Sequence, residues 1–120
     1  MKIFTPRIQL LITLILLANF SFSQTSWRGT SSTKWSTSAN WTNGVPSATK
    51  DAILGDANFS GSNQPTVDKT SSCKSISIGG TVATTLTASK NLTVSGDLLI
   101  NANGVISQGN SSLSLTGSWT

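Results

Sequence analysis

The sequence predicts an all-β protein in which an irregular, tryptophan-rich N-terminal cap is followed by the start of a right-handed parallel β-helix. Three observations lead to this fold class. Short stretches of alternating apolar and polar residues fill positions 73–120, a five-residue pattern recurs there after 21 residues, and three tryptophans stand in a polar stretch at 27–41. A small β-sandwich is the alternative, since it also has many short strands separated by turns.

Residues 1–23 have the three parts of a secretory signal peptide. Lys2 and Arg7 give a positive start, an apolar run follows, and a more polar segment ends at the Ser23–Gln24 bond, where cleavage is predicted. The apolar run is shorter than the roughly 20 residues that cross a bilayer, so a cleaved signal peptide is favoured over an uncleaved membrane anchor. We therefore expect a secreted or cell-surface protein that meets the membrane only during export.

Residues 24–72 are predicted to form the cap. Asn-Gly, Gly and Pro turn signals recur through this range, and the spacing of apolar residues is irregular. A short strand is expected at 51–54, with Ala52 and Leu54 on one face and Ile53 on the other.

Trp27, Trp35 and Trp41 are assigned to the core of the cap. Few other large apolar residues occur in this part of the chain. Burying one indole removes about 150–250 Å² from water, which contributes roughly 4–6 kcal/mol as an upper bound. The alternative is that the same three rings are exposed and form a carbohydrate-binding platform.

Residues 73–120 are predicted to hold the first coils of the β-helix. The strands are marked by apolar pairs two positions apart: Ile76 and Ile78, Leu92 and Val94, Leu98 and Ile100, and Leu113 and Leu115. The pattern Leu-x-Val-Ser-Gly at 92–96 recurs as Leu-x-Leu-Thr-Gly at 113–117, a spacing typical of one solenoid coil. Because solenoids need several repeats and capping units, we expect this chain to be the N-terminal part of a longer protein.

The composition favours a non-catalytic protein. Without His there is no Ser-His or Cys-His nucleophile pair, and no zinc site of the usual type, so neither a metal nor a cofactor is expected. Carboxylate pairs could come only from the four aspartates, Asp51, Asp56, Asp68 and Asp97. Asp51 and Asp68 flank predicted strands, where aspartate typically accepts hydrogen bonds from backbone amides in turns, so a structural role is favoured over catalysis. Six basic and four acidic residues are scattered after the signal segment, so nucleic-acid binding is not expected.

Cys73 is the single cysteine, so the chain has no internal disulfide framework. We expect it to be a small buried apolar residue. Pairing with a cysteine outside this chain is the alternative, because exported proteins meet oxidising conditions.

The order of several short motifs resembles the start of large secreted or surface β-helix proteins of Bacteroidetes. The motifs are Trp27-x-Gly29, Ala39-Asn40-Trp41, Gly44-Val45-Pro46, Asp51-Ala52-Ile53, Pro65-Thr66-Val67-Asp68, Cys73-Lys74-Ser75-Ile76 and Leu92-Thr93-Val94-Ser95-Gly96. The Trp-Asn-Trp pattern is also similar to autotransporter-associated β-strand repeats. The resemblance implies an adhesin-like protein of the type that uses type IX secretion, with a tryptophan-rich cap and a right-handed β-helix stalk, and it implies no catalytic residues.

These observations lead us to expect a non-catalytic structural module of an exported surface protein that acts in adhesion. Surface polysaccharide and other cell-surface components are the expected partners. Two alternatives stay open: the N-terminal part of a polysaccharide-degrading β-helix enzyme, and a carbohydrate-binding module that uses the tryptophan cluster.

Overall fold

The computed structural model of the chain describes residues 23–120, so the expected signal segment up to residue 22 lies outside the described residues. Short β-strands account for almost all regular structure in the described part. They are β1 (Gln24–Ser26), β2 (Asp51–Leu54), β3 (Thr66–Val67), β4 (Ser71–Cys73), β5 (Ile76–Ile78), β6 (Thr84–Ala88), β7 (Leu92–Val94), β8 (Leu98–Ile100), β9 (Gly104–Gln108) and β10 (Leu113–Leu115). A single 3-10 turn, η1 (Ser38–Asn40), interrupts the N-terminal part of these residues.

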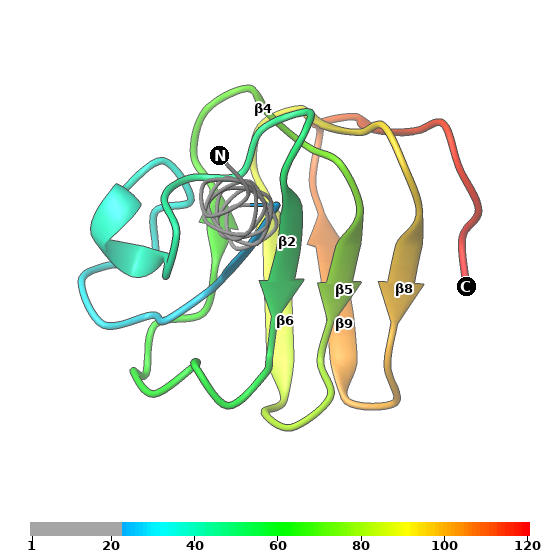
Figure 1. Cartoon of the computed structure of the whole chain (residues 1–120). Helices are drawn as coiled ribbons and strands as arrows, with labels where there is room; N and C mark the ends of the chain where they lie inside the picture. The colour runs from blue at the N-terminus through cyan, green and yellow to red at the C-terminus, as the bar shows by residue number, and fades with distance from the viewer. Residues whose placement is uncertain (1–22) are drawn as a thin grey trace, which may run out of the picture.

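The strands form three parallel sheets, and from β2 onward each sheet takes every third strand. Sheet A has the order β1-β2-β5-β8, sheet C has β3-β6-β9, and sheet D has β4-β7-β10. Every strand pair is parallel, and the chain passes from sheet A to C to D before it returns to A one turn further along (Figure 1). This is a parallel β-solenoid of about three turns, which confirms the predicted class over the β-sandwich, whose sheets are antiparallel.

The repeat read from the sequence is one turn of the solenoid. Leu92 pairs with Leu113 and Val94 pairs with Leu115, so the recurring pattern stacks on itself in sheet D. The first complete turn consists of β2, β3 and β4, which means that regular coils begin within the range 24–72. Strand β4 spans the expected border between that range and 73–120.

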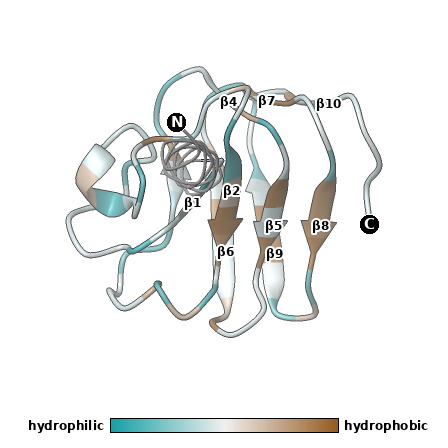
Figure 2. Ribbon diagram, in the orientation of Figure 1, coloured by the Kyte–Doolittle hydropathy of each residue, from teal (hydrophilic) through white to brown (hydrophobic). Residues whose placement is uncertain are grey.

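Alternation along each strand separates the core from the surface. In β5 and β7 the outer residues of each triplet are buried, whereas Ser77 is half-buried and Thr93 is exposed. The apolar positions of β2, β5 and β8 appear as a brown band across sheet A in Figure 2. As predicted for β2, Ala52 and Leu54 point inward. In strand β6 the buried positions are Thr84, Leu86 and Ala88, and Val82 precedes the strand in a bend.

The bends between strands stack so closely that glycine is required at some of them. Gly79 has φ +84°, and a Cβ atom there would lie 2.6 Å from the backbone nitrogen of Gly104 in the next turn. A Cβ atom on Gly104 would in turn approach the carbonyl oxygen of Ile78 to 2.2 Å. These two glycines allow neighbouring turns to keep the spacing of roughly 4.8 Å that parallel strands need.

Candidate functional site

The three tryptophans of the N-terminal region form one buried cluster. Trp41 lies in the middle, with its ring centroid 5.1 Å from that of Trp27 and 4.9 Å from that of Trp35, at interplanar angles of 81° and 75°. Trp27 and Trp35 are 0% exposed and Trp41 is 2% exposed. Both contacts are edge-to-face, the geometry that aromatic quadrupoles prefer.

The cluster is fixed to the first turn of the solenoid by backbone hydrogen bonds. The amide of Trp27 donates to the carbonyl of Ile53 in β2 at 2.9 Å, and the amide of Trp35 donates to the carbonyl of Thr66 in β3 at 2.9 Å. The rings therefore belong to the same core as the inward residues of those strands. They form a buried cluster near the N-terminal end of this core, which explains how large side chains stand in so polar a stretch.

Two indole N–H groups of the cluster have backbone partners. Trp27 Nε1 donates to the carbonyl of Asn63 at 2.8 Å, and Trp41 Nε1 donates to the carbonyl of Trp35 at 2.8 Å. Among residues 23–120, Trp35 Nε1 is the only buried side-chain nitrogen or oxygen without a hydrogen-bond partner. The surrounding rings exclude this group from solvent.

The Trp27-x-Gly29 motif has a direct structural reason. Gly29 has φ +63°, and a Cβ atom on it would lie 2.7 Å from the ring of Phe59 and 2.9 Å from Trp27 Nε1. Gly61 packs against the same backbone, since a Cβ atom on Gly61 would lie 1.9 Å from the carbonyl oxygen of Gly29. Only glycine permits this close approach of two loops.

Asn40, next to Trp41, holds the loop of the cap together. It is fully buried, and its Oδ1 accepts hydrogen bonds from the amides of Ser31 and Ser32, both at 3.0 Å. Its Nδ2 donates to Ser32 Oγ and to the carbonyl of Lys34, also at 3.0 Å. A buried amide with all its bonds made is a structural residue rather than a binding one.

The three tryptophans of the cluster thus present no ring face to solvent in this structure. A carbohydrate platform requires exposed faces on which a sugar ring can stack, so such a platform would first require the cap to open. The geometry instead fits a structural role for Trp27, Trp35 and Trp41.

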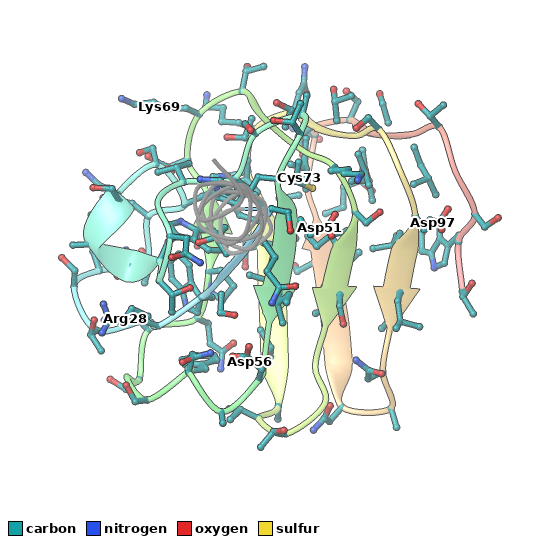
Figure 3. All side chains as sticks on the ribbon, viewed as in Figure 1. Arg28, Asp51, Asp56, Lys69, Cys73 and Asp97 are labelled. Atoms are coloured by element: carbon teal, nitrogen blue, oxygen red, sulfur yellow. The ribbon has the colours of Figure 1, made fainter. Side chains whose placement is uncertain are left out.

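The four aspartates are spread over the molecule and accept hydrogen bonds from nearby backbone or hydroxyl groups. Asp51 Oδ1 accepts from the amide of Ser75 at 3.1 Å, and Asp97 Oδ1 accepts from the amide of Ser118 at 2.9 Å. Between them, Ser75 Oγ accepts from the amide of Asp97 at 3.0 Å. Each side chain of this row therefore binds the backbone of the following turn, at the corner where sheet D leads into sheet A (Figure 3).

The other two aspartates connect the cap to the first turn. Asp56 accepts from Ser26 Oγ at 2.6 Å, and Asp68 accepts from the amide and the hydroxyl of Ser36 at 2.9 and 2.5 Å. Partial burial raises the pKa of Asp68, but the two hydrogen bonds from Ser36 outweigh this effect and hold the pKa below its ordinary value, with Lys69 acting in the same direction.

A groove with a volume of about 400 Å³ lies over the outer face of sheet A. Its lining includes Asp51, Ile53, Ser75, Asp97, Leu99 and Thr120. It runs across β2, β5 and β8, so it brings Asp51 and Asp97 to one surface, two turns apart. In parallel sheets this corresponds to roughly 9–10 Å between the two backbone positions.

Cys73 lies inside the solenoid. It is a free thiol with no exposed surface, as expected for a small apolar core residue. Burial, with a smaller contribution from Asp51, raises the pKa of Cys73 to about 12. The thiol is therefore protonated at neutral pH and inert in this conformation.

The fold also gathers lysines that are scattered in the sequence. Lys69 and Lys90 occupy equivalent positions on neighbouring turns, as do Lys50 and Lys74. The interval between Lys69 and Lys90 equals the 21-residue repeat, and this was the signal that could have revealed the pair. Net charge and clustering of charged residues along the sequence do not reveal groups that come together only through the solenoid register.

No helix within residues 23–120 is long and apolar enough to cross a membrane. The same residues contain no group of three or more His, Cys, Asp or Glu side chains that could hold a metal ion. Comparison with known proteins found no matching family, no similar curated protein and no similar solved structure.

Proposed function

We propose that the chain is a non-catalytic structural module of an exported cell-surface protein that acts in adhesion. The observation that carries the proposal is the buried tryptophan cluster, which packs on the first turn of a parallel solenoid. Burial of these rings covers the apolar core of the first turn, which a solenoid needs at its ends to be stable in solvent.

The polar side chains support the same proposal. The row from Asp51 through Ser75 to Asp97 binds the backbone of successive turns, and Asp68 joins the cap to the coil through Ser36. Groups that hold turns together in this way stabilise a scaffold. The side chains left for recognition are those on the outer faces of the sheets, which suits contact with an extended partner such as surface polysaccharide.

Export is part of the proposal, and it rests on residues 1–23 of the sequence. Cleavage after Ser23 would place Gln24 at the new N-terminus, at the first residue of β1. The strand would then begin where the mature chain begins.

Expression of the whole chain in a bacterial host tests both parts. We expect the exported product to start at Gln24 in mass spectrometry, and beads coated with this product to adhere to polysaccharide-bearing cell surfaces more than beads coated with an unrelated protein. An uncleaved product inside the cells would contradict the export claim. Equal adhesion of both bead types would contradict the adhesive role.

A polysaccharide-degrading β-helix enzyme is the second candidate, and the groove over sheet A favours it. The groove is open and carries two carboxylates, and Asp and Glu pairs are the usual catalytic groups for cleaving sugar chains. Incubation of the exported product with soluble polysaccharides, followed by measurement of new reducing ends, separates the two candidates. Cleavage that disappears in Asp97→Asn would replace the structural proposal with an enzymatic one.

A further inference from the structure

Sheet D is flanked by lysines at both of its corners. Lys69 and Lys90 lie at the corner where sheet C leads into sheet D, and Lys50 and Lys74 lie at the corner where sheet D leads into sheet A. Figure 2 shows β4, β7 and β10 along one side of the molecule, and Figure 3 places Lys69 on that side.

The register sets the first pair. Thr66 pairs with Thr87 before the corner and Ser71 pairs with Leu92 after it, so Lys69 and Lys90 are equivalent positions on adjacent turns. Both side chains are exposed. Their backbones are separated by one strand spacing, roughly 4.8 Å.

The second pair is set in the same way. Ala52 pairs with Ile76, and the amide of Lys74 donates to the carbonyl of Lys50 at 3.0 Å, so these lysines also stack on adjacent turns. Lys50 Nζ is bound to the carbonyl of Asn43 at 2.6 Å, whereas Lys74 is exposed. Within residues 23–120, the ammonium groups of Lys69, Lys74 and Lys90 make no hydrogen bond or ion pair, which leaves three cations available to a partner.

Hydroxyl groups fill the surface between the two corners. Ser72, Thr93 and Ser114 are paired in register and alternate with the inward residues of sheet D, so they form one outward row. The aspartates near these lysines are engaged in hydrogen bonds within the chain. Asp68, next to Lys69, is bound to Ser36, and Asp51 and Asp97, at the corner of Lys74, accept from backbone amides and line the groove of sheet A. We call the surface formed by Lys69, Lys74, Lys90, Ser72, Thr93 and Ser114 the basic face.

We propose that the basic face binds an acidic polysaccharide, that is, a sugar chain bearing carboxylate or sulfate groups. The lysines on neighbouring turns repeat along the solenoid axis at a spacing comparable to one sugar unit of an extended chain. The hydroxyl row offers donors and acceptors for sugar hydroxyls between the charged groups. The two corners are at most roughly 16 Å apart along five residues of backbone, so one or two chains fit across the face.

The composition of the face argues against nucleic acid as the partner. Single-stranded nucleic acid is bound by aromatic side chains on which bases stack, and the basic face contains no aromatic residue. A duplex is read by a helix or ribbon inserted into a groove, whereas this face is a narrow parallel sheet. A sugar chain needs only charge and hydroxyl contacts spaced along a line.

This inference rests on the proposed adhesive function, since it names the chemical class of the partner. The test measures the dissociation constant of the exported chain for immobilised dextran sulfate and polygalacturonate, with uncharged dextran and double-stranded DNA for comparison. The variant is Lys69→Gln with Lys90→Gln. The matched control is Arg28→Gln with Lys34→Gln, which removes the same charge from two exposed positions in the cap that are not part of the basic face.

We expect binding to both acidic polysaccharides and not to dextran. With about three charge contacts, raising salt from 50 to 200 mM should weaken binding on the order of 20- to 40-fold, by the counterion-release relation known for nucleic acids. Lys69→Gln with Lys90→Gln should weaken binding at least tenfold more than the control pair. It should also reduce, by about two, the steepness with which the logarithm of the binding constant falls with the logarithm of the salt concentration.

Four results would overturn the inference: no binding to the acidic polysaccharides, equal losses for the two variant pairs, binding to uncharged dextran, or binding to DNA as tight as to the polysaccharides. Thermal unfolding of each variant confirms that the fold is intact. If the acidic polysaccharides do not bind but beads carrying the chain still adhere to cells, the partner class is wrong and the adhesive role stands.

Discussion

Trp41→Ala is the sharpest single test of the cap. Trp41 is the ring that contacts both of the other tryptophans, and it is 2% exposed. Large-to-small substitutions of buried aromatic residues cost about 3–5 kcal/mol, and the transfer of one indole from water accounts for up to roughly 4–6 kcal/mol. Small domains have a total free energy of unfolding of about 5–15 kcal/mol.

The substitution also removes the donor to the carbonyl of Trp35. We therefore expect Trp41→Ala to lower the melting temperature by roughly 12–40 °C, at about 4–8 °C for each kcal/mol in a domain of this size. Thermal and urea unfolding followed by circular dichroism measures the loss.

Trp119→Ala is the matched control, since it makes the same chemical change at a side chain that is 63% exposed. We expect it to change the free energy of unfolding by no more than about 1 kcal/mol. The reasoning fails if Trp41→Ala melts like the parent chain, or if Trp119→Ala is equally destabilising.

Two further predictions concern the joints of the cap. Gly61→Ala should be clearly destabilised in urea unfolding, because its Cβ atom would lie 1.9 Å from the carbonyl oxygen of Gly29. Gly109→Ala is the control and should unfold like the parent chain, since a Cβ atom there would have no atom within 4 Å. Equal stability of the two variants would contradict the packing described. The pKa of Asp68 is lower in the folded chain than its ordinary value of 3.8, so its contribution to stability is present above that value and is lost as pH falls through the lowered pKa. Asp68→Asn should therefore flatten the loss of stability below about pH 4 in acid titrations, and an unchanged acid profile would show that the bonds from Ser36 contribute nothing.

Much of the coil could be predicted because its determinants are local and periodic. Alternation of period two identified the strands, and the recurrence of the 92–96 pattern at 113–117 equals one turn in the structure. Burial of the tryptophans followed from the shortage of other large apolar residues nearby. These arguments need no knowledge of long-range contacts.

The joints of the cap could not be predicted in the same way. They depend on contacts between segments about thirty residues apart, such as Trp27 with Asn63 and Ser36 with Asp68, and no periodicity marks them. The basic face was missed for a related reason, because Lys69 and Lys90 become neighbours only once the register is known. Strand β3 is only two residues long, so alternation of period two cannot mark it in the sequence. For this reason the strand pattern alone did not show that β2, β3 and β4 make a complete turn.

The central claim is that successive turns stack in parallel with the register described, and an engineered cross-link tests it most directly. Thr93 and Ser114 are paired on adjacent turns, and Ser72 lies two turns from Ser114. Cys73, with its pKa raised to about 12, should not compete in thiol exchange.

Cysteines at 93 and 114 would have Cα atoms roughly 4.8 Å apart, within the range of a disulfide, whereas cysteines at 72 and 114 would be roughly 9–10 Å apart. We predict that Thr93→Cys with Ser114→Cys oxidises to an intramolecular disulfide under native conditions, and that Ser72→Cys with Ser114→Cys stays reduced. Rapid closure of the second pair, or no closure of the first, would contradict the solenoid.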